Sequence, residues 1–255
     1  MSVTHLDQEI EVASAAARIM GSKALSYYGK QELEVSFKGN PSNPVSVADR
    51  EAQTAGLDLI RGSFPEDGFI GEEDLDAVSS SGRYWILDPI DGTIAFLHRQ
   101  HQGWGCMVSL VGVDKETLVS AVFMPATDDI YLASPGLTTG NGKRITLGKE
   151  KSLAAAHIST SINPDRQLMY PNFAPALFST ADLVHNGVGS AASAARILEG
   201  TLDANIVHAQ NVWDYTPIQH LIAEAGGCSL EHGNARITAS SEALAAELKH
   251  LVEVS

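Results

Sequence analysis

The chain is poor in cysteine. Cys106 and Cys228 are the only two among 255 residues, and they form neither a Cys-x-x-Cys nor a Cys/His metal-binding spacing. Neither a disulfide framework nor a structural zinc site is therefore expected. We expect both thiols to be reduced, in a cytoplasmic protein, and to pack as small core residues.

Basic residues and long apolar runs are also scarce. Lys and Arg number 17 against 31 Asp and Glu, which gives a formal net charge of -14. This balance disfavours a nucleic-acid surface and suits a bound cation. No apolar run approaches the roughly 18 residues that span a bilayer, and the first residues do not resemble a secretion signal. We expect no nucleic-acid partner and no membrane partner.

The chain does have enough apolar residues, 44% of the total, to bury a large core. In the first half, helical spacing of apolar residues predicts helices, and alternation or short apolar runs predict strands. The predicted helices cover 6–28 and 49–63, the predicted strands 32–38, 68–74 and 83–91, and an antiparallel meander 103–145.

The second half alternates helical and strand patterns without a linker or repeat. The helices are predicted near 165–181, 190–200, 214–226 and 241–253, and the strands near 156–160, 183–185, 203–207 and 228–230. We therefore expect layered α and β structure in one unit.

Acidic residues follow several of the apolar segments. They are Asp49, Glu72 with Glu73, Asp88 with Asp91, and Asp214. Clustered carboxylates suit hard cations such as Mg²⁺, and two such ions can act on a phosphoryl group. Thr93 follows Gly92 where a helix could begin, and free backbone N–H groups there could bind a phosphate. The pattern points to phosphate ester hydrolysis.

Each acidic pair also has a simpler interpretation. An Asp-x-x-Asp spacing is common, and a solvated turn followed by a helix cap accounts for it. The separate pairs favour that interpretation, whereas their combination favours a metal site.

Three longer segments carry a family resemblance. "GEED" (71–74), "WILDPIDGT" (85–93) and "WDYTPIQHLIAEAGG" (213–227) resemble the signature segments of the inositol monophosphatase family, in the same order. The resemblance implies an α+β fold, a layered αβαβα sandwich, usually homodimeric. It also implies Mg²⁺-dependent hydrolysis of phosphate monoesters by a single unit 1–255. Residues 1–147 would form its metal-binding α+β half, and 148–255 an α/β half that completes the site.

The resemblance also implies roles for individual residues. Metal ions, two or three in number, would be held by Glu72, Asp88, the carbonyl of Ile90, Asp91 and Asp214. Gly92 and Thr93 would bind the phosphate, with Asp91 and Asp214 also at the substrate. Glu72 and Thr93 would activate water, and Asp49 would accept a hydrogen bond from Thr93. Attack would be direct, with no phosphoenzyme.

Some positions depart from the family pattern. Ile94 and Ala95 follow Thr93 where the family commonly has Thr-Asn, and Asn186 stands where an Arg is frequent. Val207 replaces a Glu that contacts a substrate hydroxyl in inositol-cleaving members. A hydroxyl held in that way would lose a contact of about 1.5 to 3 kcal/mol.

Three polar residues lie near Val207. His208, Gln210 and Asn211 could rebuild a polar pocket, although solvated loop positions are the more common role for such residues. Trp213 is expected in the core.

Two functions follow. The first is hydrolysis of a small phosphorylated metabolite: inositol 1-phosphate, histidinol phosphate, fructose bisphosphate or adenosine bisphosphate. The second is a catalytically weak regulatory protein that binds phosphate or metal, suggested by Ala95, Asn186 and Val207.

Overall fold

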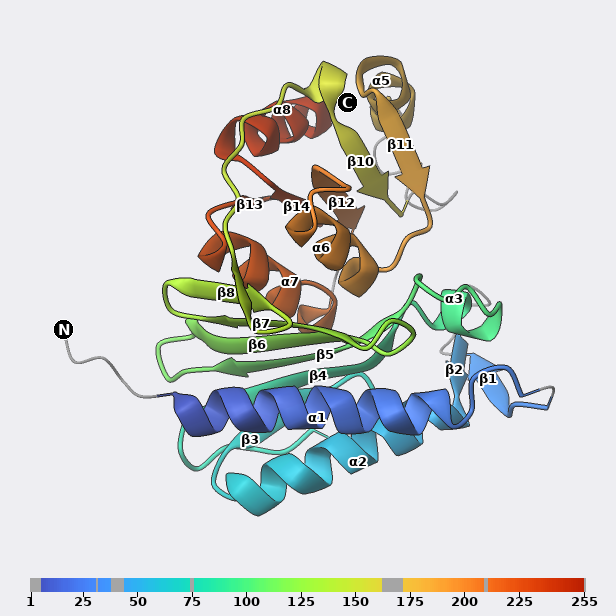
Figure 1. Cartoon of the computed structure of the whole chain (residues 1–255), viewed down its shortest axis with the longest axis vertical. Helices are drawn as coiled ribbons and strands as arrows, with labels where there is room; N and C mark the ends of the chain where they lie inside the picture. The colour runs from blue at the N-terminus through green and yellow to red at the C-terminus, as the bar shows by residue number, and fades with distance from the viewer. Residues whose placement is uncertain are drawn as a thin grey trace.

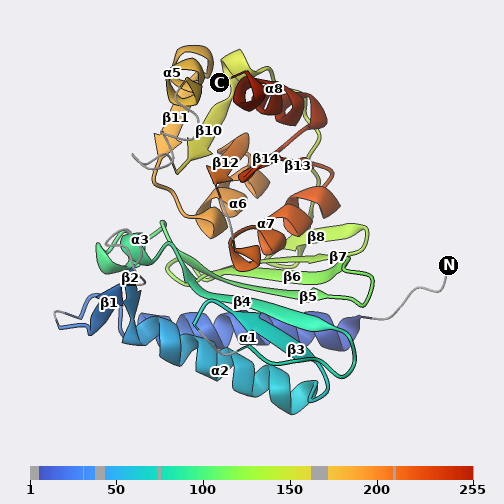
Figure 2. The same ribbon diagram turned by 180° about the vertical axis from the view of Figure 1, so that it is seen from behind.

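The protein is built in five layers of alternating helices and sheets (Figures 1 and 2). The computed structural model describes residues 6–30, 32–37, 44–73, 76–161, 172–208 and 211–254. The helices are α1 (Asp7–Leu25), α2 (Val47–Ser63), α3 (Thr93–Leu97), α5 (Phe173–Thr180), α6 (Ser190–Leu198), α7 (Val212–Glu224) and α8 (Glu242–Glu253), with a 3-10 turn at Leu153–Ala155. The order of layers is α1/α2, a seven-stranded sheet, α6/α7, a five-stranded sheet, and α5/α8 (Figure 1). This is the predicted αβαβα sandwich.

The strands fall into two large sheets and one hairpin. They are β1 (Val35–Phe37), β2 (Pro44–Ser46), β3 (Gly68–Gly71), β4 (Tyr84–Asp91), β5 (Gly105–Val111), β6 (Thr117–Met124), β7 (Asp129–Ser134), β8 (Leu137–Gly140), β9 (Lys143–Ile145), β10 (His157–Thr160), β11 (Leu183–Asn186), β12 (Ala204–His208), β13 (Cys228–His232) and β14 (Ala235–Ala239). β1 and β2 pair antiparallel with each other. The strand predicted at 32–38 is therefore confirmed in a shorter form.

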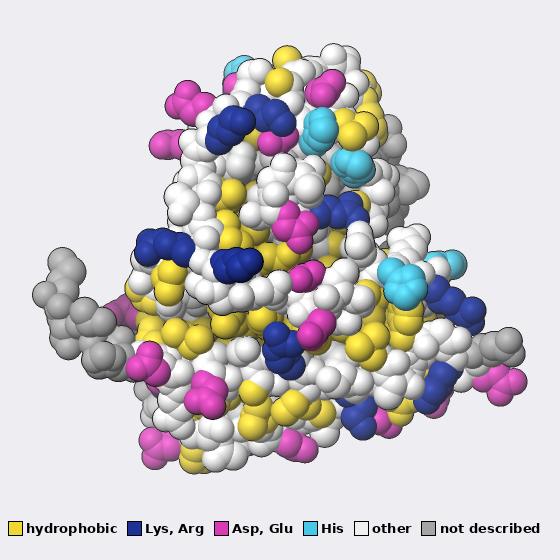
Figure 3. Space-filling model, viewed as in Figure 1, with side chains coloured by type: hydrophobic (Ala, Val, Ile, Leu, Met, Phe, Trp, Pro, Cys, Tyr) yellow, Lys and Arg dark blue, Asp and Glu magenta, His cyan; other side chains and the backbone are white. Residues whose placement is uncertain are grey.

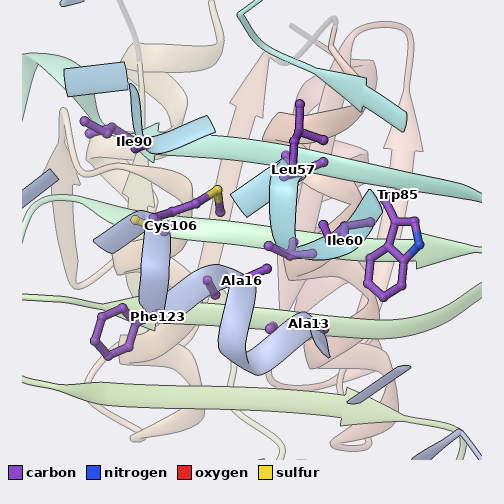
Figure 4. Close-up of a cluster of buried hydrophobic side chains, with 14 of the residues drawn as sticks. Ala13, Ala16, Leu57, Ile60, Trp85, Ile90, Cys106 and Phe123 are labelled. Carbon is purple, nitrogen blue, oxygen red and sulfur yellow. The ribbon is translucent and has the colours of Figure 1, made fainter. Parts of the chain in front are cut away.

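Helices α1 and α2, which the sequence predicts, cover the outer face of the first sheet (Figure 1). The buried stripe of α1 is made of small residues, among them Ala13 and Ala16, which let the helix lie close to the strands. Leu57 and Ile60 of α2 complete this core against Trp85 (Figure 4). Both helices are thereby fixed relative to strand β4.

The seven-stranded sheet runs β3-β4-β5-β6-β7-β8-β9. β3 and β4 are parallel, whereas every later pair is antiparallel, so the predicted meander is confirmed. Its turns contain Lys115, Asp128 and Asn141 with positive φ, as tight reversals demand. The parallel β3–β4 pair makes two strands end at one edge.

The five-stranded sheet runs β11-β10-β12-β14-β13. β10 is parallel to β11 and β12, and β14 lies antiparallel between β12 and β13. Strand β14 was missed by the sequence analysis, although Gly233 and Asn234 before it form a hairpin turn of a common type. Of the helix predicted at 165–181, the structure has α5, and residues 165–171 lie outside the described ranges.

Helices α6 and α7 form the middle layer between the two sheets (Figure 2). Their buried residues share one cluster with the first sheet, in which Ala191 and Leu221 pack with Met107 and Val122. Charged side chains of both signs are interspersed on the face shown in Figure 3. The middle layer brings second-half residues to the edge where β3 and β4 end.

Candidate active site

Strands β3 and β4 deliver acidic residues to the same edge of the sheet. Their parallel register continues one step beyond β3, where the Glu72 N–H donates to the Leu87 carbonyl at 3.3 Å. Asp88 and Asp91 follow in β4, and both are buried. Residues three apart point to opposite faces of a regular strand, but the pairing of β4 with β5 shifts register between these two aspartates. This irregularity between Asp88 and Asp91 lets both carboxylates serve one site.

The four predicted carboxylates are electrostatic neighbours. Burial, then the charges of Glu72, Asp91 and Asp214, raise the pKa of Asp88 well above its usual range. Glu72 also shares a side-chain hydrogen bond with Asp88. Asp214 comes from the first turn of α7, more than 100 residues away in the chain. The structure therefore brings together the acids of both halves.

The donor set of this acid cluster, Glu72, Asp88, Asp91 and Asp214, suits a divalent cation. Among the described residues, Asp88 and Asp91 take part in no ion pair with Lys or Arg. Within the same ranges, no three His, Cys, Asp or Glu side chains already form a ready-made ligand set. The raised pKa of Asp88 nevertheless shows an excess of buried negative charge, and carboxylate oxygens are the donors that Mg²⁺ prefers.

Gly92 and Thr93 make a sharp turn directly after β4. Gly92 is left-handed, with φ 82°, and a Cβ there would lie 2.5 Å from the Gly103 carbonyl oxygen, so only glycine fits. Helix α3 then begins at Thr93, as predicted, but it has only five residues. Its dipole is correspondingly small. Anion binding at this turn would depend on the N–H groups themselves.

Asp49 links helix α2 to Thr93. Asp49 Oδ2 accepts hydrogen bonds from the N–H and Oγ of Ser46, at 2.8 and 2.6 Å, as part of a capping box. The Thr93 hydroxyl lies 3.4 Å from Asp49 Oδ1 and 3.1 Å from the Ile90 carbonyl oxygen, to which it can also donate. Burial raises the pKa of Asp49 to about 6, against the opposing hydrogen bonds from Ser46. The expected contact between Asp49 and Thr93 is present, although it is long.

The first turn of helix α6 supports the site, in a way that the sequence patterns did not predict. Asp91 Oδ2 accepts a hydrogen bond from the Ala191 N–H at 2.8 Å, at the first turn of α6. A Cβ on Gly189 would lie 2.6 Å from the same oxygen, so glycine is needed for this approach. Burial raises the pKa of Asp91 to about 6, and the N–H groups of Ala191 and Ser190 oppose that rise. A Gly-Ser-Ala step opening a predicted helix was the available signal.

The residues that depart from the family pattern, and the polar residues near Val207, differ in their burial. Val207 is buried in β12, whereas Ile94 is half exposed at the start of α3. His208 is buried at the end of β12, so the expectation of a solvated loop position is wrong for it; strand pairing with Ala235 holds it. Asn211 is exposed before α7, and Gln210 lies outside the described ranges. Trp213 is half buried.

Helices within the described ranges are too short or too polar to cross a membrane. The buried carboxylates at the edge of the first sheet give this layered sandwich the oxygen donors that a metal-dependent hydrolase needs. The chain matches the model of the inositol monophosphatase family over residues 5–253, and it belongs to that family. Members of this family hydrolyse phosphate monoesters and depend on Mg²⁺.

Individual relatives agree with this assignment. A histidinol-phosphatase of Chlorobaculum parvum is 29% identical, with 88% of this chain and 86% of the relative covered. An inositol-1-monophosphatase of Rhizobium meliloti is 32% identical, with 79% and 76% covered.

Solved structures share the fold. The structure of the Thermotoga maritima IMPase aligns with a TM-score of 0.84 at 26% identity, covering 98% of this chain and 96% of that one. An IMPase/NADP phosphatase solved with Mg²⁺ and phosphate aligns with a TM-score of 0.83 at 18% identity, covering 98% and 97%.

Proposed function

We propose that the acid cluster is the metal and catalytic site of this phosphatase. Glu72, Asp88 and the Ile90 carbonyl would hold one Mg²⁺, and Asp88, Asp91 and Asp214 a second, with room for a weaker third. The observation that carries the proposal is the meeting of Glu72, Asp91 and Asp214 around the buried Asp88, on which their charges act. Bound Mg²⁺ would supply positive charge against these acids and make water at the site more acidic.

The chain's own residues would bind and orient the reactants. The N–H groups of Gly92 and Thr93 precede the first hydrogen bond of α3, from the Phe96 N–H to the Gly92 carbonyl, and so are available to a phosphate oxygen. Glu72 and the Thr93 hydroxyl would orient the attacking water, and its proton would go to a carboxylate, either to Glu72 directly or to Asp49 as the Thr93 hydroxyl passes its own proton on. Asp49 would hold the Thr93 hydroxyl in place. Hydrolysis would then be a direct attack of water on phosphorus, without a phosphoenzyme.

The leaving group would lie toward β12 and α6. Val207 is buried there, and its side chain has no atom that can accept a hydrogen bond. We therefore do not expect recognition of a substrate hydroxyl at this position. A relative at 29% identity is a histidinol-phosphatase, which supports testing histidinol phosphate beside inositol 1-phosphate, fructose bisphosphate and adenosine bisphosphate. Val207→Glu should raise activity on inositol 1-phosphate relative to histidinol phosphate, since it adds an acceptor.

Phosphate release from this panel, with Mg²⁺ and with EDTA, tests the proposal. Activity is expected only with metal, and Asp91→Asn should lower it by about a hundredfold because a neutral amide replaces a carboxylate ligand of the second ion. Asp58→Asn, an exposed aspartate of α2, is the matched control and should be unchanged. Equal activity in EDTA, or in Asp91→Asn, would refute the proposed site.

We also propose an oligomeric state and a cellular location for the protein. The two thiols are free, which supports a reducing, cytoplasmic setting. Phe178 and Leu183 expose apolar surface beside the edge strand β11, which supports a homodimer of single-unit chains. Light scattering should give a dimer mass for the wild type and a monomer mass for the double variant Phe178→Asp, Leu183→Asp.

A further inference from the structure

Gln53 is a buried polar residue that the site described so far does not use. It lies one turn after Asp49 on helix α2, and its side chain is fully buried. Its Oε1 accepts a hydrogen bond from the Glu73 N–H at 3.0 Å. Glu73 directly follows Glu72, so Gln53 contacts the backbone that carries one of the clustered acids.

The hydrogen bond from the Glu73 N–H to Gln53 takes the place of a hydrogen bond between strands. Strand β3 ends at Gly71, and the Glu72 N–H still reaches the Leu87 carbonyl of β4. The next N–H, that of Glu73, bonds to Gln53 instead. A buried N–H without an acceptor is costly. The hydrogen bond to Gln53 therefore keeps the backbone at Glu73 against α2, beyond the point where β3 stops pairing with β4.

Packing against Gly71 fixes the same amide. A Cβ at Gly71 would lie 2.6 Å from the Cδ, Oε1 and Nε2 atoms of Gln53. The amide plane therefore lies directly over the end of β3, where no larger residue than glycine fits. Two independent contacts, one polar and one steric, set the position of the Glu72 backbone relative to α2.

Only the oxygen of the Gln53 amide is used. Within the described part of the chain, Nε2 is buried and has no hydrogen-bond partner. The orientation of the amide follows from the chemistry, because the Glu73 N–H requires an acceptor. A carboxylate at this position would keep the acceptor, whereas a thioether of similar length would remove it.

We propose that Gln53 is a positioning residue that places Glu72 for metal binding and water activation. The inference rests on the proposed function of Glu72. Asp49 and Gln53 are four residues apart on α2 and so lie on one face of the helix. That face holds Thr93 through Asp49 and the Glu72 segment through Gln53, so one rigid element sets the spacing of the two groups proposed to act on water.

The test compares Gln53→Met and Gln53→Glu with the wild type and with Gln8→Met, an exposed glutamine of α1. Gln53→Met should raise the Mg²⁺ concentration for half-maximal phosphate release about tenfold and, because Glu72 is also proposed to activate water, lower kcat at saturating Mg²⁺ by at least about threefold. Gln53→Glu should restore the wild-type Mg²⁺ response. Gln8→Met should not alter it.

Amide hydrogen exchange at Glu73 provides a readout independent of activity. The Glu73 amide should exchange slowly in the wild type and in Gln53→Glu, and at least about tenfold faster in Gln53→Met, because only the last lacks the acceptor. If Gln53→Met does not fold, Gly71→Ala displaces the same amide and should give the same signature. Unchanged exchange at Glu73, or equal impairment of Gln53→Glu and Gln53→Met, would overturn the role of Gln53. A wild type without Mg²⁺-dependent hydrolysis would refute the proposed function alone, since exchange still reports on the contact.

Discussion

The side chain of Asp91, at the end of β4, accepts a hydrogen bond from the backbone N–H of Ala191, at the start of α6, over a distance of 2.8 Å. The two residues are 100 positions apart in the chain. One carboxylate oxygen is thereby satisfied by the second half of the protein. The same carboxylate acts on Asp88 within the acid cluster.

Gly189→Ala should disturb this contact. A Cβ at that position would lie 2.6 Å from Asp91 Oδ2 and 2.9 Å from the Gly103 carbonyl oxygen, so α6 must shift. We expect a loss of about 1 to 3 kcal/mol in the free energy of unfolding and a fall in kcat/KM. Denaturant unfolding and phosphate release measure both. Gly62→Ala, which meets nothing within 4 Å, should be neutral or slightly stabilising.

Mg²⁺ should stabilise the protein because the clustered carboxylates repel one another. At 100 times its Kd, a ligand of the folded state adds about 2.7 kcal/mol, which is about 5 to 10 °C in Tm for a chain of this size. Asp88→Asn should raise Tm in EDTA, since burial makes the ionised form unfavourable, and should abolish the response to Mg²⁺. Differential scanning calorimetry provides the measurement. A Tm that does not respond to millimolar Mg²⁺ would argue against the cluster as a cation site.

Asp49→Asn should lower the catalytic rate through its contact with Thr93. An asparagine can offer its oxygen to Ser46, but its NH₂ group then faces the Thr93 hydroxyl, which can no longer donate to it. We expect kcat to fall at least about tenfold. Thr93→Ala should cause a comparable loss, and the double variant little more, because the two residues act through one contact.

The same variant has a defined effect on pH dependence. In the metal-free protein the pKa of Asp49 is raised to about 6 from 3.8, so the neutral form is favoured by folding. Its contribution to stability is present below the unfolded pKa and is lost as pH rises through 6. Asp49→Asn should therefore reduce the stability difference between pH 5 and pH 8 by about 1 kcal/mol. Urea unfolding in EDTA at both pH values, with Asp58→Asn as control, checks this.

His220 should make the protein sensitive to acid. Its Nδ1 lies 2.9 Å from Ser120 Oγ inside the layer between α7 and the first sheet, and burial lowers its pKa from 6.5 to about 4. The unfolded chain takes up the proton first, so stability is full above pH 6.5 and falls between 6.5 and 4, by about 3 kcal/mol in all.

His220→Asn tests that prediction. Asparagine keeps a polar partner for Ser120 and does not titrate, so the pH slope of the unfolding free energy in this window should become shallower. His98→Gln, at an exposed position, should leave the slope unchanged. An identical slope in His220→Asn and wild type would contradict the assignment.

Much of the first half could be predicted because its signals are local. The helix predicted at 49–63 follows from a helical pattern, although the structure begins α2 at Val47 with Ser46 as its cap, and the acidic edge follows from apolar runs that end in Glu72 and Asp88. The helical spacing of apolar residues that predicts α1 includes Ala13 and Ala17, and both are buried. The metal roles of these acids stay predictions, since the resemblance rather than the packing assigned them.

Other features depend on tertiary contacts and left no pattern in the chain. The bond from Glu73 to Gln53 joins residues 20 positions apart, and nothing in the surrounding residues distinguishes Gln53 from an exposed helical glutamine. The need for glycine at 189 arises only from the approach of Asp91. Strand β14 is a different case: its residues, Ala235–Ala239, do alternate apolar and polar, but the segment is only five residues long, and its pairing between β12 and β13 stabilises it.

The helix layer between the two sheets has a consequence for dissection of the enzyme. Since α7 carries Asp214 and packs against strands of both sheets, a chain cut between β9 and β10 would yield two fragments that each expose a large apolar face and hold an incomplete set of acids. Neither piece should turn over substrate alone. Mixed together, they would have to reunite around that shared layer before any hydrolysis resumed.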